Sequence, residues 1–207
     1  MISAIIPQIS AYSNLKQKRN VSFQHNAAKL SRINIGSCPD GFIAKVKVRK
    51  NCDETFVNIF KKTLGKHAEN YTIQNDKNEV LGNVNLVIIK PEPCSWMPSW
   101  NSYIFVDELR NFSLPETPYH NKSLEYHKDI GTRLIQIALR RSEEEGCKGN
   151  IQLITVSQAR DWYKNIIGMQ QMYPQVPGEP YFNNPNQLYL PDKNKEALAK
   201  LRGGLGF

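Results

Sequence analysis

Apolar and polar residues alternate along several short segments of the 207-residue chain, which is the pattern of a β-strand with one face in water. The clearest example is residues 42–49, where Ala44, Val46 and Val48 are interleaved with lysine and arginine. Two other alternating segments flank a polar stretch and predict a hairpin. The predicted strands span residues 42–49, 71–74, 84–89, 102–109, 150–156 and 187–190.

Three segments repeat apolar residues at helical spacing instead. Residues 51–65 begin with acids, carry lysines near their end and close on a glycine, so they predict a helix. Residues 132–145, which follow Gly131, predict an amphipathic helix packed on a sheet, and residues 158–167 a short helix ended by Gly168. The apolar stripe of the first segment consists of Phe56, Ile59, Phe60 and Leu64.

The predicted elements follow the order strand, helix, hairpin, strand, helix, strand, helix, strand. This order predicts an α/β protein in which helices cross between strands of one mixed sheet. Residues 1–40 are polar and lack sustained periodicity, so we expect a basic, poorly ordered arm or linker ahead of a domain at 41–207. Residues 110–126 contain two prolines and predict a long loop.

The formal net charge of +8 is distributed unevenly. Residues 1–50 hold nine basic side chains and one acid, whereas residues 51–207 balance to zero. A basic arm can bind nucleic acid or another polyanion, but the sequence favours a solvated leader. We therefore do not expect nucleic acid as a partner.

Composition limits the class of protein further. Hydrophobic residues make up 40% of the chain, which is enough for a buried core and excludes a disordered chain. The four cysteines have neither metal-ligand spacing nor a disulfide pattern, so we expect reduced thiols, no bound metal and a cytoplasmic location. No apolar run approaches the roughly 18 residues of a spanning helix, so we expect no membrane partner.

The stretch from Tyr126 to Leu134 carries the first candidate chemistry. A basic turn with Gly131 leads there into a helix, and the first backbone N–H groups of a helix attract an anion. His127, Lys128 and Arg133 add positive charge at the same place. Many helices follow a glycine, so this pattern needs support from elsewhere in the chain.

A second stretch supplies that support. The two motifs are Tyr126-x-x-Asp129-x-Gly131 and, about 30 residues later, Ala159-x-x-Trp162-Tyr163 with Gly168-Met169. In this order and spacing, residues 42–192 resemble the GCN5-related N-acetyltransferase (GNAT) family. That family opens its central helix with Gln/Arg-x-x-Gly-x-Gly/Ala and continues with Ala-x-x-Phe-Tyr and a Gly-Phe pair. The resemblance implies a GNAT-like mixed, mostly antiparallel twisted sheet with flanking helices and a splayed central strand pair.

The resemblance also implies the position of acetyl-CoA, the family's co-substrate. Its pantetheine arm would lie between the strand ending near Leu109 and the strand ending near Val156. A backbone N–H near Leu109 would stabilise the oxyanion of the reaction. The diphosphate would contact the backbone amides of His127, Lys128, Asp129, Ile130, Gly131 and Thr132.

Two side chains match the family's catalytic positions. Tyr163 resembles the general acid that protonates the departing thiolate, although a core aromatic beside Trp162 is the alternative. Glu108, or else Asp107, would take a proton from the acceptor amine. Because strand alternation predicts that Ile104, Val106 and Glu108 share one face, Glu108 would continue an apolar surface, which is costly unless it is paired or partly wet. An ordinary surface acid remains the alternative.

The chain departs from the family pattern at four places. Asp129 replaces the first glycine, Tyr126 replaces glutamine or arginine, Met169 replaces phenylalanine, and one extra residue precedes Gly168. We expect an acetyl-CoA-dependent N-acetyltransferase whose amine acceptor cannot be read from the sequence, and we leave a homodimer open. The alternatives are a catalytically inactive GNAT-fold binding module, with Asp129 as its signature, and a nucleic-acid-associated protein that uses the basic arm.

Overall fold

The computed structural model describes residues 34–50, 53–90, 102–115, 117, 119–172 and 184–191. These residues all belong to one compact unit, Asn34–Leu205. Most of the predicted basic arm, residues 1–33, lies outside the described residues, so its order and its role stay predictions.

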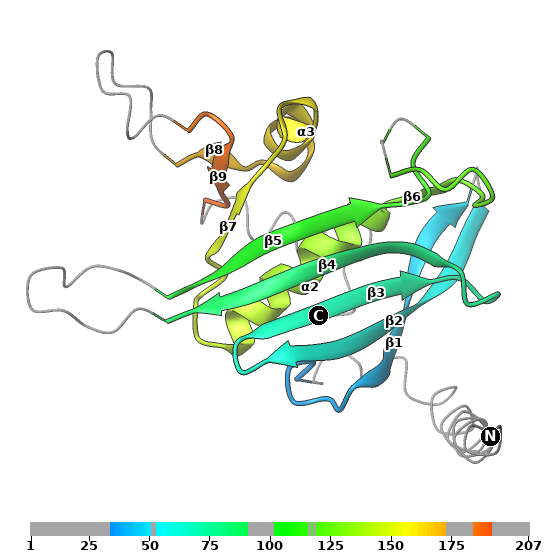
Figure 1. Ribbon diagram of the computed structural model, residues 1–207, viewed down its shortest axis with the longest axis horizontal. Helices are drawn as coiled ribbons and strands as arrows, with labels where there is room; N and C mark the ends of the chain where they lie inside the picture. The colour runs from blue at the N-terminus through cyan, green and yellow to red at the C-terminus, as the bar shows by residue number, and fades with distance from the viewer. Residues whose placement is uncertain are drawn as a thin grey trace, which may run out of the picture. The chain divides into compact units, whose positions relative to one another are not determined.

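One sheet runs through the described part of the chain, with nine strands in the order β6-β1-β2-β3-β4-β5-β7-β9-β8 (Figure 1). All neighbouring pairs in this sheet are antiparallel except β5 and β7, which are parallel. Helix α2 connects β5 to β7, as a parallel pair requires. The predicted GNAT-like sheet, mixed and mostly antiparallel, is therefore confirmed. The strands are β1 (Gly41–Lys50), β2 (Asp53–Gly65), β3 (Ala68–Gln74), β4 (Val80–Ile89), β5 (Tyr103–Asn111), β6 (His127–Lys128), β7 (Ile151–Ile154), β8 (Gln170–Gln171) and β9 (Gln187–Tyr189).

The helices are α2 (Ile130–Glu144), α3 (Ser157–Trp162) and the π-helix η2 (Tyr163–Ile167). Figure 1 shows α2 against one face of β3, β4 and β5, and its buried face contributes Leu134, Ile135 and Leu139 to the core. Gly82 on β4 permits close approach of this helix. A Cβ there would lie 2.7 Å from Ile130 Cγ2 and 2.8 Å from the Arg110 carbonyl oxygen.

The predicted helix at 51–65 is wrong, because residues 53–65 form strand β2. Val57, Ile59 and Lys61 are buried on one face of this strand, whereas Phe56 and Leu64 from the supposed helical stripe are 51% and 52% exposed. β-Branched and aromatic residues favour a strand, and β2 pairs with β1 on one side and β3 on the other. Pairing with the neighbouring strands thus outweighs the acids, lysines and glycine that indicated the start and end of a helix.

The remaining predicted elements are confirmed within a few residues. The hairpin corresponds to β3 and β4, and the long amphipathic helix corresponds to α2. The short third helix is divided into α3 and η2. Strands β6 and β8 were not predicted, because two residues are too few to show a period.

A buried group of charged side chains joins the C-terminal end of α2 to the sheet. Arg141 is 2% exposed, and its Nε and Nη2 donate to the two carboxylate oxygens of Glu69 at 2.7 and 3.0 Å. Arg141 also donates to Glu144 at 2.9 Å and to Glu145 at 2.7 Å. Tyr71 donates its hydroxyl to Glu69 at 2.8 Å. The guanidinium therefore holds three carboxylates together inside the protein.

The same group fixes the segment that leads into β1. The backbone N–H groups of Ile35 and Gly36 donate to the two carboxylate oxygens of Glu144 at 2.8 and 2.9 Å. Gly36 has to be small, because a Cβ there would lie 2.0 Å from Arg141 Nη1. Lys61 of β2 completes the cluster 3.5 Å from Glu69, which explains a lysine on the buried face of that strand.

Candidate functional site

Strands β5 and β7 pair over a short distance and then separate. The parallel pairing covers three residues of each strand and ends with Val106 opposite Leu153. β5 continues to Asn111, whereas Thr155, just after β7, donates its backbone N–H to the Asn186 carbonyl. Figure 1 shows β7 turning away from β5. The predicted splay of the central strand pair is thus present.

A β-bulge lies where the two strands separate. Leu86 is opposite Val106 and Asn85 is opposite Glu108, so Asp107 is the extra residue of β5. The bulge reverses the alternation of side chains beyond it. Residues directly opposite in an antiparallel pair share a face, so Glu108 shares the face of Asn85 and Val106 the opposite face, that of Leu86. The prediction that Glu108 continues the apolar face of Ile104 and Val106 is therefore wrong.

Glu108 lies on the face of the sheet opposite α2 and is held there by two neighbours. Asn85 Nδ2 donates to Glu108 Oε2 at 3.3 Å, and Arg110 Nη2 forms an ion pair with Glu108 Oε1. The Glu108 side chain is 31% exposed, so water or a ligand can reach it. Asp107 is exposed, and no hydrogen bond of its side chain to the described residues is found.

The backbone of Leu109 faces the space between β5 and β7. Phe112 donates its N–H to the Leu81 carbonyl, so these two opposite residues form a hydrogen-bonded pair of the β4–β5 ladder. Hydrogen-bonded and non-hydrogen-bonded pairs alternate along an antiparallel ladder, and Leu109, opposite Val84, belongs to a non-hydrogen-bonded pair. Its N–H and C=O are therefore directed away from β4. No β7 residue is paired with Leu109. Its N–H is therefore available on the side where the sequence predicts the thioester.

The turn before α2 is tied to β1. His127 and Lys128, as β6, pair with Lys50 and Arg49. The His127 ring is 3% exposed and its Nδ1 lies 2.8 Å from the Glu125 carbonyl oxygen, whereas the Lys128 side chain is exposed. The pairing engages backbone groups of β6, so the strongest candidate donors for an anion are the amides that follow.

The first turn of α2 presents three such amides. Asp129, the N-cap residue, has a φ of 75° in the left-handed region, and its carbonyl accepts the first helical hydrogen bond, from Arg133 N–H at 2.9 Å. The N–H groups of Ile130, Gly131 and Thr132 have no acceptor among the described residues, although these residues are buried. Buried N–H groups usually have a partner, so these three can bind a ligand.

The carboxylate of Asp129 is turned toward β1 and compensated there. Arg49 Nε lies 3.2 Å from Asp129 Oδ2, and the Asp129 side chain is only 3% exposed. The left-handed backbone at this position is the conformation that glycine adopts without cost. Aspartate in place of the family glycine therefore preserves the turn, and its charge is partly neutralised by Arg49.

Trp162 bounds the same amides on the other side. A Cβ on Gly131 would lie 3.1 Å from the Trp162 ring, so this glycine lets the indole pack directly against the first turn of α2. Trp162 also meets Tyr163 edge to face, with ring centroids 4.8 Å apart. The packing of Trp162 on Gly131 brings the second sequence motif to the first.

Tyr163 begins the π-helix η2. The one extra residue before Gly168 is accommodated as this π-helix, and Met169 N–H closes it on the Tyr163 carbonyl at 2.9 Å. The Tyr163 side chain is 6% exposed, and no hydrogen bond of its hydroxyl to the described residues is found. Burial raises the pKa of this phenol, so it stays protonated at neutral pH and can donate.

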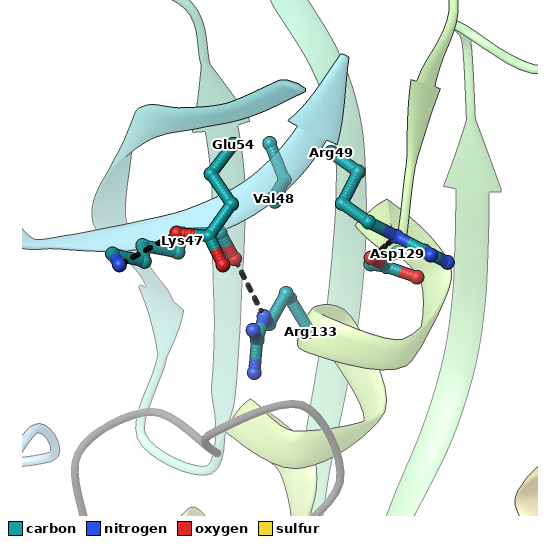
Figure 2. A pocket seen from close by; sticks show the side chains of 6 residues that line it. All are labelled: Lys47, Val48, Arg49, Glu54, Asp129 and Arg133. Carbon is teal, nitrogen blue, oxygen red and sulfur yellow. Dashed lines mark hydrogen bonds and ion pairs between the residues drawn. The ribbon is translucent and has the colours of Figure 1, made fainter. Parts of the chain in front are cut away.

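A cavity of about 230 Å³ lies between β1 and the start of α2 (Figure 2). Arg133 reaches from α2 to β1 and donates from Nε to the Lys47 carbonyl at 3.0 Å, while Lys47 pairs with Glu54 at 2.7 Å. Desolvation lowers the pKa of Arg133. The sequence did not indicate Lys47, Arg49 and Glu54, because they lie more than 70 residues before the motif, on strands whose pairing with the start of α2 could not be foreseen. The cavity is lined by Lys47, Val48, Arg49, Glu54, Asp129 and Arg133.

No group of three or more histidine, cysteine, aspartate or glutamate side chains is arranged to hold a metal ion in the described ranges. Among the helices described, none is long and apolar enough to cross a membrane.

Comparison with known proteins finds similar solved structures but no match by sequence. No protein-family model matches the chain, and no curated protein matches it. Its structural neighbours are GNAT acetyltransferases. The neighbours include KacTA in a complex with DNA (15% identity, 65% of this chain and 74% of that chain, TM-score 0.44), AtaTR bound with AcCoA (15%, 64% and 73%, TM-score 0.41) and nourseothricin acetyltransferase (15%, 72% and 84%, TM-score 0.37).

Proposed function

We propose that this protein is an N-acetyltransferase that transfers the acetyl group of acetyl-CoA to an amine by direct attack. The observation that carries the proposal is two sets of backbone donors. The Leu109 N–H is directed toward the space between β5 and β7, and the amides of Ile130, Gly131 and Thr132, at the start of α2, have no acceptor among the described residues. A thioester with a diphosphate tail needs both kinds of donor.

The roles of the other residues follow from their positions. The amides of 130–132 would hold the diphosphate, with the exposed Lys128 nearby and the buried His127 supporting the turn. The Leu109 N–H would stabilise the charge that develops on the thioester oxygen. Glu108 would take a proton from the amine on the face of the sheet opposite α2. Tyr163 would donate a proton to the departing thiolate.

Binding of acetyl-CoA is the direct test of this proposal. A ligand present at 100 times its Kd adds about 2.7 kcal/mol to the unfolding free energy, which a thermal-shift measurement detects. The gain should also occur with CoA, which shares the diphosphate, and should be much smaller with acetylated pantetheine, which lacks it. No shift at millimolar acetyl-CoA would refute the enzyme.

Substitution Tyr163→Phe tests the chemical step separately from binding. It removes one hydroxyl, so the affinity for acetyl-CoA should change less than about twofold while kcat falls by on the order of 100-fold. Thiol release from acetyl-CoA in the presence of an amine measures kcat. Unchanged turnover would show that Tyr163 is a core aromatic.

A catalytically inactive binding module is the second candidate, favoured by the carboxylate of Asp129 at the family's glycine position. Such a module would bind acetyl-CoA or CoA but release no thiol with any amine. The two functions therefore share the binding result and differ in turnover.

A further inference from the structure

Polar side chains form a line across the face of the sheet opposite α2, beside the splayed strands. Asn70 of β3 is opposite Asn85 of β4, which is in turn opposite Glu108 of β5. Asn70 Nδ2 donates to Asn85 Oδ1 at 2.7 Å, and Asn85 Nδ2 donates to Glu108 Oε2 at 3.3 Å. Arg110 holds the other carboxylate oxygen of Glu108. These four residues are here called the outer-face polar cluster.

The cluster fixes the orientation of the Glu108 carboxylate. The Asn85 oxygen accepts from Asn70, so the Asn85 NH₂ group is directed to Glu108. Arg110 is itself held, because its guanidinium lies 4.7 Å from the centroid of the Tyr119 ring. Each carboxylate oxygen therefore has a positioned donor, while 31% of the side chain stays exposed.

Two buried atoms, one within the cluster and one beside it, lack hydrogen-bond partners among the described residues. Asn83 Oδ1 and Arg110 Nε are buried, and neither has a partner among the described residues. Asn83 and Arg110 are directly opposite on β4 and β5, one step along the ladder from Asn85 and Glu108. One atom is an acceptor and the other a donor, and buried polar atoms rarely stay unpaired. Hydrogen-bonding capacity of this kind marks a place that a ligand or a bridging water completes.

We propose that the outer-face polar cluster receives the acceptor as a primary ammonium, and that Asn85 and Arg110 position Glu108 to remove its proton. This inference rests on the proposed acetyl transfer. One proton passes from the ammonium to the carboxylate, and the freed nitrogen lone pair forms the C–N bond. The C–S bond breaks, and the thiolate takes a proton from the Tyr163 phenol. The second proton lost by nitrogen passes through solvent to the Tyr163 phenolate, and Glu108 then releases the first proton to solvent.

The charged surroundings of Glu108 are few among the described residues. Arg110 is the cation that contacts it, and Asp107 is the neighbouring acid on the same strand. β4 and β3 contribute neutral asparagines, Asn85 and Asn70. Arg110 is thus the group whose removal changes the electrostatic potential at the carboxylate most.

The test uses the full chain with acetyl-CoA and two probe amines, spermidine and a lysine-containing peptide, with thiol release as the readout. Asn85→Ala should lower kcat about tenfold and leave the KM for acetyl-CoA within about twofold, because the base is misplaced while cofactor contacts persist. Asn58→Ala is the matched control. Asn58 is a residue of β2 whose side chain is not buried and makes no hydrogen bond with described residues. The kcat of the Asn58→Ala variant should therefore stay within about twofold of the wild-type kcat.

Arg110 is tested by its charge. Arg110→Gln should lower kcat for spermidine about tenfold and leave the KM for acetyl-CoA within about twofold, because the ion pair that holds the Glu108 carboxylate is lost. Arg110→Lys should restore most of the wild-type kcat. A merely structural role for Arg110 would change the folding stability and leave kcat in place.

Hydroxylamine provides the final discrimination, because it is unprotonated at neutral pH and needs no base. Glu108→Gln and Asn85→Ala should therefore slow acetylation of spermidine far more than that of hydroxylamine. Equal slowing of both, or unchanged kcat in Asn85→Ala, would overturn the inference. Acetyl-CoA binding without turnover of either probe amine would overturn the ammonium assignment. Absence of acetyl-CoA binding would instead refute the proposed function itself.

Discussion

The two ends of helix α2 treat their polar groups in opposite ways. At the C-terminal end, Arg141 bonds three carboxylates, and Glu144 in turn accepts two backbone N–H groups from residues 35 and 36. At the N-terminal end, three buried amides have no acceptor among the described residues. The contrast teaches that this fold completes its hydrogen bonds where they hold the sheet together and leaves them open where a ligand is expected.

The charged residues near the two ends of α2 make the contrast sharper. The helix macrodipole is negative at the C-terminal end, where acids lie next to the last turn, and positive at the N-terminal end, where arginines lie next to the first turn, so both arrangements are unfavourable. At the C-terminal end, cations from α2 and from the sheet compensate the acids. At the N-terminal end, the charge of Arg49 and Arg133 favours a bound anion, so the unfavourable arrangement becomes useful when such an anion is present.

The largest expected effect is on stability, at the C-terminal end. Arg141→Ala should lower the unfolding free energy by about 3–5 kcal/mol, because Glu69 would stay buried without its main cation. Urea unfolding measures the change. The control is Lys90→Ala, which breaks an exposed pair with Glu145 and should cost less than about 1 kcal/mol. Similar losses for both variants would contradict the assignment of this end as the stabilising one.

The next effect is on ligand binding, at the N-terminal end. Arg49→Ala removes a cation from the buried carboxylate of Asp129, so acetyl-CoA affinity should fall about tenfold, equal to roughly 1.4 kcal/mol. Calorimetric titration with acetyl-CoA measures it. Lys45→Ala, an exposed position on the same strand that does not line the cavity, should bind like the wild type.

A smaller effect of opposite sign is expected from Asp129→Gly. Glycine adopts the left-handed backbone of this turn without cost, and its introduction removes a negative charge beside the amides. Acetyl-CoA affinity should rise about threefold while stability changes by less than about 1 kcal/mol. If the affinity falls, Asp129 supports the turn rather than opposing the phosphate.

The smallest effect concerns pH. The hydrogen bond from Lys90, assisted by Arg141, lowers the pKa of Glu145 below its ordinary value of about 4.5. A carboxyl pKa that is lower in the folded state than in the unfolded state stabilises the folded state at any pH above the unfolded-state pKa. This contribution is lost as the pH falls through the folded-state pKa. The Tm of the wild type should therefore drop more than that of Lys90→Ala on acidification below about pH 4.5. Parallel curves would show that the Lys90–Glu145 pair contributes nothing to this pH dependence.

Sequence patterns predicted most of the sheet and the central helix because those elements have clear periods and single buried faces. They misassigned β2, whose buried Lys61 breaks the apolar alternation that would have revealed the strand. They also placed Glu108 on the wrong face, because a bulge at Asp107 cannot be read from the residues around it. The motifs located the start of α2, whereas its partners on β1 depend on pairing between distant segments.

Two single-residue irregularities lie on opposite sides of the splay, the bulge at Asp107 on the β5 side and the π-helix that follows β7 and α3. Each shifts the direction of the side chains that follow it. Residues before the irregularity keep the alternation that packing requires, and the side chains of residues after it point in a different direction. Substitution tolerance measured along β5 should therefore keep its period of two residues but change phase at Asp107, moving from one parity of residue number to the other. The side chains beside the space between β5 and β7 can in this way be reoriented without disturbing the core that supports them.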